Sequence, residues 1–352
     1  MAVLTARAGR RRLVNLGAAA ERFVAIGLVL AVVVWMIKNL AEGPTEFGNT
    51  FISGLSNGAT YAMIALGYTL VYGIIELINF AHGDLFMLGT MLSANMMAHW
   101  LGFTSPTATG FAGLALTMLV AMIFCSTINV GAEFFAYRRL RSAPKLAPLI
   151  TAVGLSFVFQ NIGQLVNGGG SPKQWNTIFY DKNGVEKAFH VGGIVIRWSS
   201  LVIVAVTILV LLLLTYIVTR TRQGKAMRAT AQDQDGARLM GIDVNRTISF
   251  TFGLGGAMAG IAAALYQQAT GTTWFQSGFQ LGLFAFTSAV LGGIGNLAGA
   301  VLGAVLIGVI EAQNVTYGFG SNWNSSVIFS ILIIVLVFKP EGILGRRTTE
   351  KV

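Results

Sequence analysis

The chain has 352 residues, of which 54% are hydrophobic and only 11% are Asp, Glu, Lys or Arg, with a formal net charge of +10. Soluble globular domains carry about 25% charged residues, so this composition excludes an ordinary water-soluble fold. One cysteine, Cys125, excludes disulfide scaffolds, zinc knuckles and cysteine-ligated iron–sulfur clusters. The apolar residues come in runs of about 20, long enough to cross a bilayer core about 30 Å thick, which predicts an all-α polytopic membrane protein.

The positive charge is gathered in four clusters: before residue 23, at 138–145, at 220–246 and after residue 338. In membrane proteins basic clusters mark the cytoplasmic side. We therefore expect both termini to be cytoplasmic, an even number of crossings, and no nucleic-acid partner. Residues 1–21 form a basic tail, and the apolar run behind it is an uncleaved first helix, because further spans follow it.

In chain order, the apolar runs predict eight spans within a membrane domain at 22–340, followed by a cytoplasmic tail at 341–352. The spans lie near 22–41, 50–75, 84–101, 112–136, 147–168, 194–219, 248–269 and 323–339. The apolar segment 281–316 is left over and could be two full spans or a re-entrant hairpin, giving eight to ten spans. A hairpin would line a pathway, because irregular backbone at membrane depth must be covered by protein or face a cavity. Its interrupting glycines are then candidate pathway or gate residues: Gly292, Gly293 and Gly295.

Glycine accounts for 43 residues, so about five pairs spaced four apart arise by chance, and Gly54/Gly58 or Gly256/Gly260 alone predict little. The three-step ladder Gly295, Gly299 and Gly303 instead predicts a tight helix–helix contact, since small residues let helix backbones approach in membranes.

Polar groups near the second and third spans suggest a second candidate site, formed by Glu76, Asn79, His82 and Asp84. A helix-turn-helix explains them if Asn79 and Asp84 cap helix ends. A gate or solute pathway, a metal site and a proton relay that also uses Glu133 and Glu311 are alternatives. Glu133 and Glu311 could instead pair with Lys or Arg, because isolated charges at membrane depth are costly.

Two loops exceed connector length: 169–193, expected outside, and 220–247, expected in the cytoplasm. In the second loop, small and apolar residues between 226 and 240 alternate with charges at helical spacing. This pattern predicts a short amphipathic helix at the membrane face, although a solvated loop also fits. Its apolar face, followed by Gly241, suits docking into a groove on a partner.

The chain has no phosphate-binding loop of its own, because Gly224-Lys225 is followed by Ala226 and lacks the earlier glycine. With three histidines and no catalytic triad, we expect neither an enzyme nor a metal site. An ion-coupled secondary transporter or channel stays open, because Glu76, Asp84 and Glu311 could serve coupling.

Several segments resemble a known family. Asp235-Gly236-Ala237-x-x-x-Gly241 resembles the Glu-Ala-Ala-x-x-x-Gly cytoplasmic loop of permeases in ATP-binding-cassette (ABC) importers, with departures at two of its first three positions. Five further segments resemble the first permease subunit of branched-chain amino-acid importers, in the family's order: 57–75 (NGATYAMIALGYTLVYGII), 77–84 (LINFAHGD), 143–150 (APKLAPLI), 287–295 (TSAVLGGIG) and 338–345 (FKPEGILG).

This resemblance implies a transport subunit in the plasma membrane of a prokaryote, surrounded by membrane lipid. Its partners would be a second homologous permease, two cytoplasmic ATP-binding subunits and an extracytoplasmic solute-binding protein, with ATP used by the partners and no cofactor here. Relatives that carry urea or short amides are the alternative. The coupling loop would comprise Arg228, Ala229, Asp235, Gly236, Ala237 and Gly241.

Overall fold

The computed structural model describes residues 34–102, 108–141, 143–144, 146–180 and 186–345. Residues 34–42 are helical, and the rest of the first expected span, 22–41, lies outside the described residues together with the basic tail 1–21. Most of the C-terminal tail 341–352 is likewise outside them.

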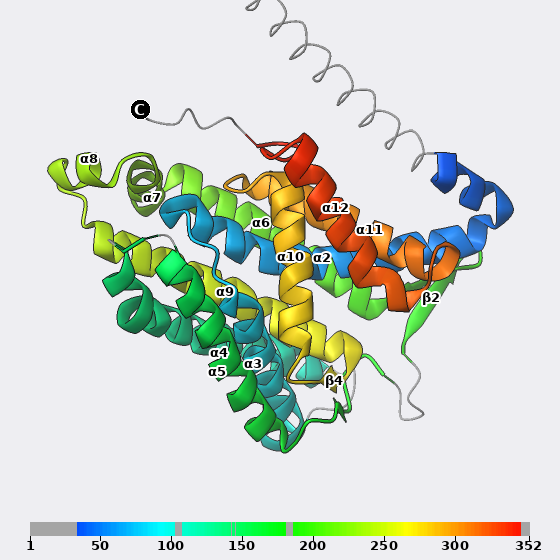
Figure 1. Ribbon diagram of the computed structural model, residues 1–352. Helices are drawn as coiled ribbons and strands as arrows, with labels where there is room; N and C mark the ends of the chain where they lie inside the picture. The colour runs from blue at the N-terminus through cyan, green and yellow to red at the C-terminus, as the bar shows by residue number, and fades with distance from the viewer. Residues whose placement is uncertain (1–33, 103–107, 142, 145, 181–185, 346–352) are drawn as a thin grey trace, which may run out of the picture.

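The described chain is mostly helical (Figure 1), in agreement with the predicted fold class. Its helices are α2 (Pro44–Ile75), α3 (Ala81–Asn95), α4 (Ala108–Ala132), α5 (Leu146–Asn167), α6 (Trp198–Arg220), α7 (Arg222–Gln232), α8 (Gln234–Leu239), α9 (Val244–Thr270), α10 (Ser277–Gly292), α11 (Leu297–Tyr317) and α12 (Asn324–Phe338). A π-helical turn, Met96–Leu101, prolongs α3, and another, Glu133–Tyr137, followed by a 3-10 turn, Arg138–Leu140, prolongs α4; a further 3-10 turn, Ser321–Trp323, leads into α12.

Seven helices of the described chain are long and apolar enough to cross a membrane. They are α2, α4 with its extension, α5, α6, α9, α11, and α12 with the 3-10 turn before it. The predicted third span, 84–101, is helical throughout as α3 and its π-helical extension to Leu101, but it is not among these seven helices. The leftover segment 281–316 forms a pair of helices, the 16-residue α10 and the 21-residue α11, joined by a short turn.

The core lies around α2 and α9. The most apolar stretches of these helices are 83% and 72% buried, compared with 6% for α12. Helix α2 packs against α11 and α9, and α9 also packs against α4 and α3. Helices α4, α5, α6 and α12 present apolar side chains to the outside, as expected for a surface that meets lipid.

Close helix contacts depend on Gly58, Gly256 and Gly260, whose spacing of four could have arisen by chance. A Cβ atom on Gly308 of α11 would lie 2.3 Å from the backbone nitrogen of Gly58 on α2. Similarly, a Cβ on Gly256 or Gly260 of α9 would collide with the α4 backbone. The pairs of glycines four residues apart therefore do mark helix contacts. In a membrane no hydrophobic force drives helices together, and close backbone packing stabilises their contact instead.

The connection between α2 and α3 returns into the bundle. Helix α2 ends at Glu76, which adopts a left-handed conformation (φ 51°), and no regular structure follows until α3 begins at Ala81. The His82 ring nevertheless lies edge-on to the Tyr68 ring, with centroids 4.9 Å apart. Tyr68 precedes the end of α2 by about two turns, or about 10 Å. The expected connection from helix to helix is present, but α3 starts inside the protein.

The long loop 169–193 contains short strands. β1 (Lys173–Gln174) pairs with β4 (Thr272–Thr273), and β2 (Ala188–Val191) pairs with β3 (Ile194–Arg197), both antiparallel. The expected start of a span at 194 is therefore corrected to Trp198, since the hairpin partner of β2 occupies 194–197. In Figure 1 these strands lie at the end of the molecule away from α7 and α8. We refer to the two ends as the strand end and the α7–α8 end.

Candidate functional site

The region 220–247 folds as two short helices whose boundaries follow from three capping side chains. The Thr221 hydroxyl accepts a hydrogen bond from the backbone N–H of Gly224 (3.0 Å) and starts α7. Asp233 caps α8 and Asp243 caps α9 by accepting from the N–H groups of Asp235 and Arg246 (3.1 and 3.0 Å). Such caps satisfy N–H groups that a helix start leaves free, so the local sequence sets each break.

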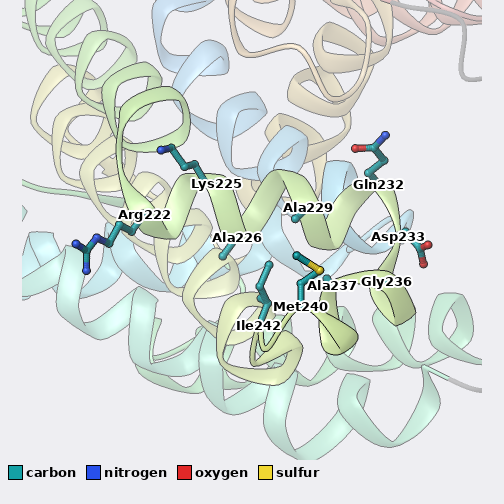
Figure 2. A pocket seen from close by; sticks show the side chains of 10 residues that line it. All are labelled: Arg222, Lys225, Ala226, Ala229, Gln232, Asp233, Gly236, Ala237, Met240 and Ile242. Carbon is teal, nitrogen blue, oxygen red and sulfur yellow. The ribbon is translucent and has the colours of Figure 1, made fainter.

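The α7–α8 unit is amphipathic, as predicted, and it rests on the bundle. Met227 and Thr230 of α7 and Ala237 of α8 are buried, whereas Leu239 and Met240 at the end of α8 are 89% and 82% exposed. Between the helices lies a groove of about 640 Å³ (Figure 2), lined by Arg222, Lys225, Ala226, Ala229, Gln232, Asp233, Gly236, Ala237, Met240 and Ile242. Large apolar side chains exposed beside a groove and among charges indicate a protein-docking surface.

The candidate coupling residues have distinct positions in this unit. Arg228 donates to the Thr219 carbonyl oxygen (3.4 Å), and Asp235 forms an exposed ion pair with Arg238 (2.9 Å). Exposed pairs of this kind contribute about 0–1 kcal/mol, so Asp235 is available to a partner at little cost. Gly241 ends the unit with φ +80°, a conformation that favours glycine. Ala229, Gly236 and Ala237 line the groove, and Ala237 also packs in the core.

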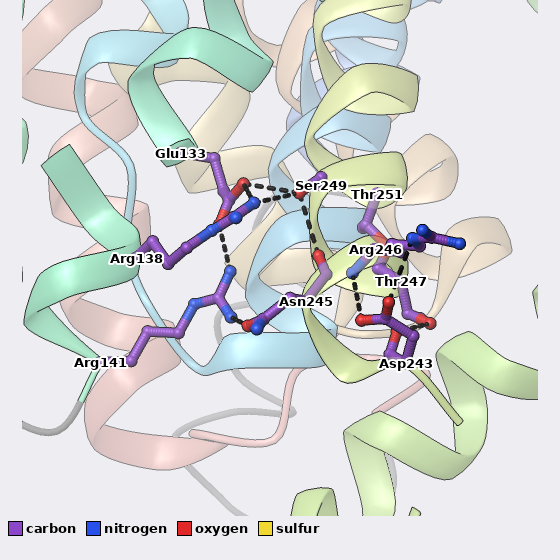
Figure 3. A network of polar contacts seen from close by, with 9 residues as sticks. All are labelled: Glu133, Arg138, Arg141, Asp243, Asn245, Arg246, Thr247, Ser249 and Thr251. Carbon is purple, nitrogen blue, oxygen red and sulfur yellow. Dashed lines mark hydrogen bonds and ion pairs between the residues drawn. The ribbon is translucent and has the colours of Figure 1, made fainter. Parts of the chain in front are cut away.

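A polar network joins α4 to α9 near the same end (Figure 3). The buried Glu133 carboxylate pairs with Arg138 (2.8 Å) and Arg141 and accepts from the Ser249 hydroxyl (2.7 Å). Arg141 also donates to the Asn245 side chain (2.7 Å). Of the two carboxylates considered for a proton relay, Glu133 is thus ion-paired. The network fixes the start of α9, immediately after the α7–α8 unit.

The segment Glu76 to Asp84 makes long-range contacts. Asn79 accepts a hydrogen bond from the Tyr137 hydroxyl on the α4 extension (2.8 Å). The fully buried Asp84 carboxylate accepts from the hydroxyl of Ser156 and the amide of Gln160 (3.4 Å), both on α5. Neither residue caps α3, whose preceding residue Phe80 makes no side-chain cap. Side-chain capping by Asn79 is therefore wrong, whereas Asp84 does lie in the first turn of α3, where a carboxylate suits the positive helix end. The described residues also contain no group of three or more His, Cys, Asp and Glu that could hold a metal.

The glycine turn between α10 and α11 is tightly packed. A Cβ on Gly303 would lie 2.1 Å from the Ser288 oxygen, and one on Gly299 would lie 2.4 Å from the Gly292 oxygen, so two of the three ladder glycines join α11 to α10. Gly295 does not, because it lies in the turn with φ +91° and its Cβ would meet no atom within 4 Å.

The C-terminal segment covers this turn. Ile343 and Leu344 donate backbone hydrogen bonds to the carbonyl oxygens of Leu291 and Gly292 (2.8 and 2.9 Å). A Cβ on Gly293 would lie 2.4 Å from the backbone nitrogen of Gly345, so the close approach requires glycine. Of the three candidate gate glycines, Gly292 and Gly293 thus lie beneath residues 341–345, and Gly295 lies in the turn beside them.

One face of α2 carries a polar and aromatic stripe at positions i, i+4, i+11 and i+15: Asn57, Tyr61, Tyr68 and Tyr72. Near the strand end, Asn57 and Tyr61 line a cavity of about 370 Å³ with residues of α9, α10 and α11. Further along α2, Tyr68 and Tyr72 border a space of only about 10 Å³ with Leu77, Ile78, Phe286, Ala289 and Ile294. The stripe is therefore open near the strand end and closed toward the α7–α8 end.

The sequence offered Glu311 as a residue for a proton relay, for ion coupling or for an ion pair; in the structure it lies at the cavity wall, where it accepts a hydrogen bond from the Tyr61 hydroxyl (2.6 Å). Asn57, Tyr61 and the α5 partners of Asp84 were missed. The i, i+4, i+11 spacing on α2 was a usable signal for Tyr61, whereas nothing local points Ser156 toward Asp84, which is 72 residues away.

Comparison with known proteins adds to this geometry. The family model "Branched-chain amino acid transport system / permease component" matches residues 50–337. The high-affinity branched-chain amino acid transport system permease protein BraD of Pseudomonas aeruginosa is 40% identical over 86% of this chain and 96% of its own length. The LivH permease protein of Escherichia coli K12 is 38% identical over 89% of this chain and 100% of its own length.

A probable LivH of Methanocaldococcus jannaschii is 25% identical over 88% of this chain and 95% of its length. Among solved structures, PsaBC from Streptococcus pneumoniae in complex with Fab matches with a TM-score of 0.44 and 13% identity, covering 86% of this chain and 95% of that one. The family model spans most of the membrane-embedded chain, and two relatives exceed 30% identity over nearly their whole length. The chain belongs to the family of branched-chain amino acid transport system permease components.

Proposed function

We propose that this chain is the membrane-spanning permease subunit of an ABC importer for branched-chain amino acids in the plasma membrane of a prokaryote. The α7–α8 end is cytoplasmic in this proposal, and both termini lie on that side. The basic residues at 138–141 and 220–246 support this orientation, because they lie on α7, α8 and the network at the start of α9, and positive charge marks the cytoplasmic face.

The observation that carries the proposal is the α7–α8 unit, with Leu239 and Met240 exposed beside an open groove. A large apolar side chain in water is unfavourable by about 1.5–3 kcal/mol relative to burial, so two adjacent ones favour a partner that covers them. A cytoplasmic ATP-binding subunit is the partner that this family requires, and two such subunits would drive a pair of permeases. The exposed apolar faces of the outer helices leave room for a homologous second permease and for lipid.

Transmission follows from the attachments of the unit. Helix α7 continues from α6 after Thr221, and α8 leads through Gly241 and Asp243 into α9, which contacts α2 at the centre. The Glu133 network ties the start of α9 to α4. Closure of the ATP-binding subunits would therefore shift α6, α9 and α4 together and alternate access along α2. An extracytoplasmic binding protein would deliver the solute at the strand end.

The docking prediction concerns the two exposed side chains. Leu239→Asp combined with Met240→Asp should abolish or strongly reduce co-purification of the ATP-binding subunits, because charge replaces the apolar contact at the centre of the surface. The permease should still fold, since neither side chain packs inside it. The measurement is pull-down of a tagged permease co-expressed with its partners, followed by ATP-driven leucine, isoleucine and valine uptake in proteoliposomes.

Phe319→Asp is the matched control, because Phe319 is a 75% exposed apolar residue near the strand end. It should leave ATPase co-purification unchanged. Full retention of the ATP-binding subunits by the Leu239/Met240 variant would contradict docking at α8. Uptake by the permease without any ATP-binding subunit would instead establish a channel or secondary transporter, and uptake of urea or acetamide in place of leucine would establish the amide-transporting alternative.

A further inference from the structure

Glu311 is a carboxylate without a charged partner on an otherwise apolar span. The Tyr61 hydroxyl donates to it (2.6 Å), and the Asn324 amide lies at 3.5 Å. None of the ion pairs between described residues includes Glu311. By contrast, the other span carboxylate, Glu133, has two arginines. Neutral hydrogen-bond donors orient Glu311 but leave its negative charge uncompensated.

This carboxylate borders a polar cavity near the strand end. The cavity, of about 370 Å³, lies within the range of about 300–1,000 Å³ typical of small-molecule sites. Its walls combine aromatic and apolar groups with a few polar ones: Asn57, Tyr61, Tyr266, Trp274, Gln280, Leu281, Phe284 and Glu311. These walls suit a ligand that has a cationic group and an aliphatic side chain.

We propose that the Glu311 carboxylate binds the α-ammonium group of the transported amino acid as it enters from the strand end. This inference rests on the proposed transport function and identifies the residue that recognises the positive charge of the solute. A compact ammonium group with three donors suits a carboxylate that already accepts from Tyr61. The aromatic rings of Tyr266 and Trp274 add cation–π attraction, and Leu281 and Phe284 offer contact to a branched aliphatic side chain.

The same arrangement disfavours neutral and anionic solutes. Urea and short amides carry no positive charge. They therefore do not compensate the charge of a carboxylate that is partly shielded from water. A fatty acid with the side chain of leucine would place a second negative charge beside Glu311. The site therefore selects for an ammonium group in addition to the selection made by the binding protein.

The test uses the purified complex without its binding protein and three probes of nearly equal shape: leucine, 3-methylbutylamine and 4-methylpentanoate. Wild type should bind leucine and the amine, detected by ligand-induced thermal stabilisation and saturation-transfer NMR, and should bind 4-methylpentanoate about 10-fold or more weakly. Glu311→Gln should lose this preference for the ammonium group. Its leucine uptake should fall about 10-fold while ATPase co-purification stays normal.

Glu46→Gln is the matched control, because it removes the same charge from an exposed position near the same end and outside the cavity. Tyr61→Phe keeps the charge but removes the donor that orients it, so it should give an intermediate loss. Equal probe preference in wild type and Glu311→Gln, or a Glu311 role seen only as a change in the pH dependence of uptake, would overturn the ammonium site. Absence of ATP-driven leucine uptake by the wild-type complex would instead contradict the proposed function.

Discussion

Asp84 joins two helices through side chains far apart in sequence. Its carboxylate on α3 accepts hydrogen bonds from Ser156 and Gln160 on α5. Helix α5 otherwise packs mainly on α3 and presents most of its surface outward. The hydrogen bonds of this single carboxylate therefore fix the angular position of α5 against the core. We propose a structural role for Asp84, in contrast to Glu311, which faces a cavity.

The residue-scale prediction is that Ser156→Ala lowers the free energy of unfolding by about 1–3 kcal/mol, because it removes a donor from a buried carboxylate. Thermal unfolding of the purified complex measures this loss. Ser330→Ala is the control, since the Ser330 hydroxyl bonds only to its own exposed helix, and it should unfold at the wild-type temperature. An unchanged unfolding temperature for Ser156→Ala would show that Asp84 does not need this donor.

At the scale of elements, the contact between α2 and α11 organises the core. Gly54 and Gly58 on α2 face Gly308 on α11, where added Cβ atoms would fall within 3 Å of backbone atoms. Backbone atoms cannot move aside as flexible side chains can. These three glycines therefore hold α2 and α11 at the separation at which the Tyr61 hydroxyl contacts Glu311.

We expect Gly308→Ala to destabilise the protein by about 1–3 kcal/mol, since it overpacks a contact that cannot relax. Gly154→Ala provides the comparison because a Cβ on Gly154 of α5 meets nothing within 4 Å. That substitution should be neutral or stabilising by up to about 1 kcal/mol, the helix-propensity difference between Gly and Ala. Thermal unfolding of both variants checks the pair, and equal behaviour would contradict close packing at Gly308.

At the scale of the whole molecule, the two ends differ in character. The α7–α8 end carries the basic residues of α7 and α8, the Glu133 network and the docking groove, whereas the strand end carries the two small two-stranded sheets and the Glu311 cavity. An importer needs this polarity, because solute is delivered on one face and energy is applied on the other. The orientation of the chain in the membrane is therefore directly testable.

The single cysteine, Cys125, is buried, so Cys125→Ala provides a background without reactive thiols. Single Leu239→Cys and Val191→Cys variants then place one thiol at each end, on side chains that are 89% and 56% exposed in the parent protein. When the permease is expressed without its ATP-binding subunits, a membrane-impermeant maleimide should label only position 191 in intact spheroplasts and only position 239 in inside-out vesicles. Labelling of position 239 in intact spheroplasts would reverse the proposed orientation.

Local sequence features predicted much of the architecture. Runs of apolar residues located the described spans, and the alternation of charge with apolar residues between 226 and 240 located the α7–α8 unit. Both are local signals, since span length and helical amphipathicity depend on residues within a few turns. The five segments between Asn57 and Gly345 that resemble branched-chain amino-acid permeases predicted the family, which the comparisons confirm.

The sequence by itself thus determined the membrane class, the positions of most helices and the family. Only the tertiary structure decided that the segment after Glu76 returns into the bundle, that Asp84 bonds to α5, that Gly295 stands outside the packing stripe, and that Glu311 meets Tyr61 at a cavity. The physical reason is distance along the chain. Tyr61 and Glu311 are 250 residues apart, and no local pattern encodes which of many apolar faces brings two such residues together.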